Sequence, residues 1–320
     1  YGASLWGMSE TQEEDDAFPV VAELSNFPSL GDQLHQGFLE WLPLTRAVKS
    51  RISSMQELTT RNVTVDTDEM FYSGISQGGI FGPTFVALSP EIRYGHAGVP
   101  GHTYSVLLHR SVDFAQFFDV MKETYTDVVE QLMGLHTIQL LWDQTDSVSY
   151  VRHLSAEPFD AGDTNHMIFA PAKGDFQVAV HQNEVLARTP DLGIALMANY
   201  DPSDGRTVDL ATETAYPHTG SAVVLYDFNQ EDDAMISWRN AWPPAGNLPP
   251  RHGDQNACDA ACPVDREFER AAFGCCHGQC CYDAHELPRR RDWHNDQMIH
   301  FFRNNGEVID VCNGDGCTPD

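Results

Sequence analysis

The chain has 320 residues, a formal net charge of −28 and 42% hydrophobic residues. A chain of this length can bury a substantial core and is expected to form one or two domains. The negative charge excludes nucleic acid as a partner, because its phosphates would be repelled, and it disfavours anionic membranes. No apolar run approaches the ~20 residues that a transmembrane helix needs.

The basic residues include only three lysines, so the acidic surface is also lysine-poor. Such a surface stays soluble in high salt, and a saline habitat is one interpretation. An ordinary soluble extracellular protein is the other. The chain opens with Tyr1-Gly-Ala-Ser, without Met or a basic start. We therefore expect a processed piece of a longer precursor, whose upstream part is a potential partner.

The first elements predicted are a loop over residues 5–16 and a long helix over about 30–52. Ser29 is placed as the N-cap of this helix, with Asp32 three residues on. Leu34 and Phe38 begin an apolar pattern at helical spacing. Pro43 is expected to kink the helix or split it in two.

The stretch from Asp68 to Gly82 contains a G-x-S-x-G pentapeptide centred on Ser76. A short apolar strand beginning at Met70 precedes it, and a helix over residues 77–88 follows, which Pro83 would bend or break. A strand, a sharp turn and a helix are the setting of a nucleophile elbow, in which the serine hydroxyl is exposed. The Gln77 N–H would then stabilise an oxyanion. The alternative is a glycine-rich turn with an ordinary serine.

Three segments carry a resemblance to a known superfamily: residues 72–82, 99–101 and 111–114. They resemble the secreted bacterial lipase/esterase branch of the α/β-hydrolases. The resemblance covers most of residues 1–230 and 285–312.

The resemblance implies an α/β fold with a mostly parallel sheet, whose first strands lie upstream of this chain. The implied hydrolase core spans residues 1–229 and 285–312, with a helical cap at about 105–160. Residues 230–284 would be a disulfide-rich insertion and 313–320 a C-terminal tail. No HGGG-like oxyanion loop is visible, so the partner oxyanion donor is expected outside this chain.

After the elbow, His96 to Gly101 is predicted to form a short buried strand and its exit turn. Residues 112–142 are predicted to be helical, because apolar residues recur at helical spacing. They could form a cap over the site, but a helix core is the more ordinary interpretation of these side chains: Phe114, Phe117, Phe118, Met121, Val128, Val129, Leu132 and Met133.

The triad acid is predicted to be Asp175, which ends a strand that begins at His166 and precedes a helix at about 180–188. A plain helix N-cap is the alternative role for this aspartate. Asp143 and Asp146 are weaker alternatives, since they follow a helical pattern. Residues 221–227 are predicted to be the last strand of the sheet.

The base must be chosen among 14 histidines. His285 lies in a loop before an apolar terminal helix, where the resemblance places the base, and it completes the order Ser, Asp, His. His294 and His252 are alternatives. His181 lies in a helical run close after Asp175, and His218 precedes the last strand, so both are disfavoured.

The eight cysteines fall in two groups, which predicts four disulfides in an oxidising compartment. Cys312 and Cys317 flank a tight turn and are expected to pair. Zinc ligation, with His277 nearby, is the alternative for the other group, whose pairing stays open. A calcium site at Asp310, Asn313 and Asp315 is conceivable, but a solvated turn is the simpler interpretation. The members of the larger group are Cys258, Cys262, Cys275, Cys276, Cys280 and Cys281.

The expected function is cleavage of carboxylic esters, small or lipid, by Ser76, His285 and Asp175 through an acyl-enzyme. No metal or other cofactor is expected, and the predicted location is extracellular or on the cell surface. An acyltransferase with the same triad and a non-catalytic binding protein on the same fold are the alternatives.

Overall fold

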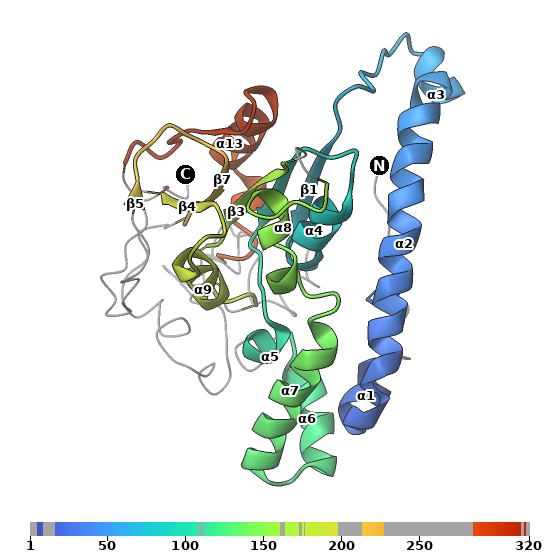
Figure 1. Ribbon diagram of the computed structural model, residues 1–320, viewed down its shortest axis with the longest axis vertical. Helices are drawn as coiled ribbons and strands as arrows, with labels where there is room; N and C mark the ends of the chain where they lie inside the picture. The colour runs from blue at the N-terminus through green and yellow to red at the C-terminus, as the bar shows by residue number, and fades with distance from the viewer. Residues whose placement is uncertain are drawn as a thin grey trace, which may run out of the picture.

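The protein is a mixed α/β structure built on a six-stranded sheet (Figure 1). The strands lie in the order β1-β2-β3-β7-β4-β5, and every neighbouring pair is parallel. This confirms the α/β class predicted from the sequence. The strands are β1 (Phe71–Ile75), β2 (Tyr94–Gly98), β3 (His166–Ala170), β4 (Ile194–Met197), β5 (Glu213–Thr214) and β7 (Ser221–Val223). The computed structural model describes residues 5–8, 17–108, 111, 113–160, 164–172, 175, 177–197, 213–226, 284–314 and 317.

Both faces of the sheet are covered, as a parallel sheet requires. Along β3, Met167 and Phe169 point into one hydrophobic core, and Ile168 and Ala170 point into a second core on the opposite face. Helix α4 (Gln77–Leu88) packs on the first face and α13 (Asp292–Arg303) on the second. Helices α4 and α13 are thus anchored on opposite faces of one sheet.

Helix α2 (Phe27–Arg51) is a single helix of 25 residues that flanks the sheet (Figure 1). Pro43 lies inside it, so the expected split is wrong; α4 likewise continues through Pro83. Ser29 is not the N-cap, because the helix begins two residues earlier, after Asn26. The Ser29 hydroxyl instead donates to the Asn26 carbonyl at 2.8 Å. Packing of the buried α2 face outweighs the local preference of one proline and one serine.

Helices α6 (Ala115–Thr124) and α7 (Val128–Trp142) form a hairpin that projects from the sheet (Figure 1). Phe117 and Met121 are buried, as expected of a helix core. Val128, Val129 and Met133 are not, with 60% to 65% of each residue exposed. The helical spacing of these three therefore does not correspond to burial, because α7 also carries apolar residues on its exposed side.

The remaining described elements are short and connect or flank these layers. Strands β4 and β5 extend the sheet at one side and have no counterpart among the predicted elements. No described helix combines the length and the apolar composition needed to cross a membrane. Most of residues 230–284, predicted as an insertion, lies outside the described residues. The short elements are α1 (Phe18–Ala22), η2 (Leu24–Asn26), η3 (Ile52–Ser54), α3 (Gln56–Thr59), α5 (Tyr104–Leu107), η5 (Ser147–Ser149), α8 (Arg152–Ser155), α9 (His181–Arg188), β6 (His218–Thr219), η8 (Pro288–Arg290) and β8 (Glu307–Val308).

Candidate active site

Ser76 is the single residue between β1 and α4, and its backbone is held in an uncommon conformation. Its φ is 57° and its ψ is −121°, which for a residue with a side chain costs of order 1–3 kcal/mol. The surrounding bonds maintain it. The Ser76 N–H donates to the Gly98 carbonyl at 3.0 Å, and its carbonyl accepts from the Ile80 N–H at 2.9 Å. The turn thus joins the sheet to the helix as a nucleophile elbow does.

The two glycines of the pentapeptide have different roles. A Cβ on Gly74 would collide with the carbonyl of Gly78 and the hydroxyl of Tyr72, so no larger residue fits there. A Cβ on Gly78 would approach only the Tyr72 hydroxyl, at 3.7 Å. That hydroxyl donates to the Gly78 carbonyl at 2.7 Å, and burial raises the pKa of Tyr72, which keeps its proton. This hydrogen bond from Tyr72 stabilises the turn, and no sequence pattern predicted it.

His285 joins Ser76 to Asp175 through its two ring nitrogens. His285 Nε2 lies 2.8 Å from Ser76 Oγ, and His285 Nδ1 lies 2.7 Å from Asp175 Oδ2. The histidine is 2% exposed and the aspartate 1%. The three residues selected from the sequence therefore meet in one hydrogen-bonded chain, although they belong to distant segments.

The loop that carries His285 is fixed by contacts of the residues before and after the histidine. Its neighbours Ala284 and Leu287 are fully buried in the core between the sheet and α13. The Arg289 guanidinium donates to the His285 carbonyl at 3.5 Å and pairs with Glu286 at 3.0 Å. The loop leads into α13, so the packing of that helix against the sheet sets the position of the imidazole.

Asp175 has hydrogen bonds on both carboxylate oxygens. Oδ1 accepts from the N–H groups of Gln177 and Val178, each at 2.8 Å, while Oδ2 faces His285. The two bonds on Oδ1 correspond to the capping role that was the alternative for this aspartate. The bond on Oδ2 is the contact expected of a triad acid, so one side chain has both roles. These bonds hold the carboxylate in a fixed orientation toward His285.

The hydrogen-bond chain selects one tautomer of His285. An ionised Asp175 has no proton to donate, so Nδ1 carries the proton of the 2.7 Å bond. Nε2 is then left with its lone pair toward the Ser76 hydroxyl. Gln77 is the first residue of α4, and its N–H has no acceptor four residues back within the helix. The positive end of the helix dipole therefore lies at Ser76, where an oxyanion would form.

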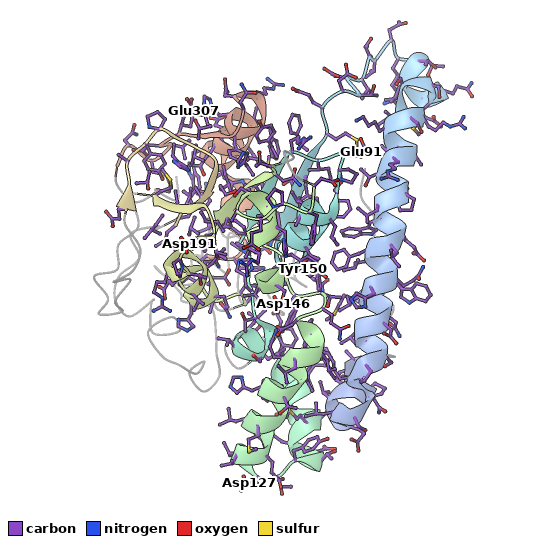
Figure 2. All side chains as sticks on the ribbon, viewed as in Figure 1. Glu91, Asp127, Asp146, Tyr150, Asp191 and Glu307 are labelled. Atoms are coloured by element: carbon purple, nitrogen blue, oxygen red, sulfur yellow. A yellow bond between two sulfur atoms is a disulfide. The ribbon has the colours of Figure 1, made fainter. Side chains whose placement is uncertain are left out.

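The other carboxylates and imidazoles considered lie elsewhere. Asp146, labelled in Figure 2, is fully buried, and its carboxylate accepts from the backbone N–H groups of Thr103 and Tyr104. Asp143 accepts from the Gln139 side chain at 2.8 Å.

Of the alternative histidines, His181 lies in α9, where it faces Glu184 at 3.5 Å, and His218 lies in β6. His294 is buried between α13 and the sheet and faces His96. His252 is outside the described residues.

The structure bonds Cys312 to Cys317, the pair expected from their spacing. The Asp310 carboxylate accepts from the Cys312 N–H at 2.9 Å, while Asp315 lies outside the described residues. Across the described part of the chain, no three His, Cys, Asp or Glu side chains are grouped as metal ligands. The six cysteines between 258 and 281, and the zinc alternative that rests on them, lie outside it.

Comparison of the chain with protein-family models, curated proteins and solved structures found no match. The site therefore has to be interpreted from its own geometry.

Proposed function

We propose that the protein is a serine hydrolase of the α/β-hydrolase type that cleaves carboxylic esters through Ser76, His285 and Asp175. One observation carries the proposal: the continuous chain from Ser76 Oγ to His285 to Asp175, with bonds of 2.8 and 2.7 Å. Such a chain activates a serine hydroxyl as a nucleophile. The strand-turn-helix around Ser76 and the chain order Ser, Asp, His are further support.

The reaction follows from these contacts. Ser76 Oγ attacks the ester carbonyl carbon while His285 Nε2 takes the hydroxyl proton. The oxyanion is stabilised by the Gln77 N–H, and Asp175 stabilises the imidazolium. When the tetrahedral intermediate collapses, the ester C–O bond breaks and His285 gives its proton to the leaving alcohol. Water then attacks the acyl-enzyme, His285 takes its proton, and the carboxylic acid leaves with Ser76 Oγ protonated again.

Substitution of the serine tests the proposal directly. Ser76→Ala is expected to lower p-nitrophenyl ester hydrolysis by at least about 10³-fold, with little change in Tm, because the nucleophile is lost while the fold is kept. Ser73→Ala, on the exposed part of the same strand, is the matched control and should stay near wild type. A fluorophosphonate probe should label the wild type and the control on Ser76 only. Activity of Ser76→Ala within about tenfold of wild type would show that the assignment is wrong.

Two outcomes would instead support the alternatives. An acyltransferase would give a new ester when an alcohol is added to the reaction, in preference to the free acid. A non-catalytic binding protein would leave the fluorophosphonate unreacted, even though the three side chains are in contact.

A further inference from the structure

A small apolar cavity lies directly beside the proposed nucleophile. It is enclosed by α1, α2, α6 and α7 and reaches the first residue of α4. Its volume is about 60 Å³. Among the described residues that line it, Gln77 alone has an amide or charged side chain. Its apolar wall includes Val21, Phe118, Met121 and Leu135.

The cavity is placed to receive the acyl part of a substrate rather than the alcohol part. Gln77 lines the cavity and follows Ser76 directly in the chain, so the cavity borders the residue next to the nucleophile. The alcohol must leave toward His285 Nε2, which protonates it. His285, Asp175 and their neighbours do not line the cavity. With the alcohol on the histidine side, the group left to enter the cavity is the acyl chain.

The volume limits the length of that chain. A cavity of about 150 Å³ binds benzene, which is about 25 Å³ for each carbon, so about 60 Å³ holds roughly two to three carbon atoms. We propose that this cavity binds the acyl chain beyond the carbonyl carbon, and that the substrates are esters of short apolar acids with about three to four carbons. The inference rests on the proposed function and specifies its substrate class.

A series of p-nitrophenyl esters from acetate to dodecanoate tests the proposal. We expect kcat/KM to rise by about fourfold for each added methylene up to about three to four carbons, since burial of each contributes about 0.8 kcal/mol. Beyond about four to six carbons the rise should stop or reverse. Equal kcat/KM for acetate and butanoate, or a steady rise to dodecanoate, would overturn the proposal while leaving the hydrolase assignment intact.

Two cavity variants and a control make the test specific. Val21→Phe fills the cavity from half-buried α1 and should move the optimum to shorter chains. Phe118→Ala enlarges it and should move the optimum to chains longer by two or more carbons. Leu140→Ala removes a side chain that is 71% exposed on the same hairpin and outside the cavity, so the profile should not move. An unchanged optimum in both cavity variants would place the acyl chain elsewhere.

A readout independent of turnover separates this proposal from the proposed function. The rate at which butyl and dodecyl fluorophosphonates label Ser76 should show the same chain-length preference. No labelling with either probe would contradict the nucleophile assignment and the acyl site together. Labelling at equal rates would contradict the acyl site alone.

Discussion

Among the almost fully buried histidine rings, His285 and the pair formed by His96 and His294 differ in what their ring nitrogens contact. His285 is 2% exposed and has a partner on each nitrogen, Ser76 Oγ on one side and Asp175 on the other. His96 on β2 is fully buried and His294 on α13 is 2% exposed; their rings meet edge to face, with centroids 4.7 Å apart. None of the four nitrogens of this pair has a hydrogen bond of acceptable geometry within the described structure.

The difference is one of electrostatics rather than of burial. Asp175 can balance the positive charge that His285 acquires when it takes a proton. Among the described residues, no carboxylate is hydrogen-bonded to either ring of the His96–His294 pair. Burial lowers the pKa of His96 well below its usual range, and the neighbouring His294 lowers it further. For His294, burial lowers the pKa to about 4; Asn295 nearby acts in the opposite direction, and Arg289 adds to the lowering.

The comparison shows which histidine site is suited to the proposed role of base. Both histidine sites border the same turn, because Gly98, next to His294 Nε2, accepts the Ser76 N–H. Only His285 has the oriented partners that proton transfer requires. The pair instead packs α13 against the sheet, and α13 carries the loop of His285.

The largest effect is expected when the same substitution is made at each of the two histidine sites in turn. His285→Gln is expected to lower kcat/KM for a p-nitrophenyl ester by at least about 10⁴-fold, because no group remains to take the Ser76 proton. His294→Gln keeps the triad and should stay within about tenfold of wild type. Steady-state kinetics with active-site titration measures both. A larger loss in His294→Gln, with the fold retained, would make His294 the base.

The aspartate can be tested without altering its local turn. In Asp175→Asn, the amide oxygen can still accept from the Gln177 and Val178 N–H groups. Its amino group would then donate to His285 Nδ1 and favour the tautomer with the proton on Nε2, which cannot accept the Ser76 proton. We expect a loss of about 10⁴-fold in kcat, as removal of this charge causes in triads of this type.

The matched control is Asp143→Asn. In the described structure, the one hydrogen bond of the Asp143 carboxylate comes from the Gln139 side chain. It should keep activity within a few fold. Near-normal activity of Asp175→Asn would show that Asp175 acts only as a turn cap.

Local patterns predicted the nucleophile segment well. The strand before Ser76 and the helix over Gln77–Leu88 were predicted with bounds close to those observed, because the apolar run and the glycines lie within a few residues of each other. Asp175 and His285 were selected by chain order and by resemblance, and the structure brings both to Ser76. Helix α2 began about three residues earlier than its local signals indicated and continued through Pro43, since tertiary packing outweighed them.

Features that depend on distant contacts were missed. Strands β4 and β5 gain their hydrogen bonds from β7 and from each other, and no alternating pattern marked them in advance. The His96–His294 contact joins a strand to a helix far along the chain. No spacing in the sequence reveals such a pair. The exposure of Val128, Val129 and Met133 is also a tertiary property, because their sequence pattern alone suits a core.

The smallest expected effect concerns stability in acid and comes from the His96–His294 pair. A base with a lowered pKa in the folded state binds fewer protons than in the unfolded chain. Its stabilising contribution is therefore complete above about pH 6.5 and is lost as pH falls toward 4. A pKa near 4 for His294 against an ordinary value of 6.5 corresponds to a loss of roughly 3 kcal/mol in the free energy of unfolding.

The double variant His96→Leu, His294→Leu isolates this contribution, because all other titrating groups are shared with the wild type. We expect denaturant midpoints of the two proteins to be similar at pH 8, since replacing two buried groups without partners by apolar ones is near neutral. Between pH 6.5 and 4 the wild type should lose at least roughly 3 kcal/mol more than the variant, because His96 adds to the loss from His294. His35→Gln, at the exposed side of α2, should follow the wild type. Parallel stability curves for wild type and double variant across this range would mean that the pair is hydrated or hydrogen-bonded in solution. In that case, the difference between His285 and the pair could not be explained by a lack of hydrogen-bond partners on the rings of the pair.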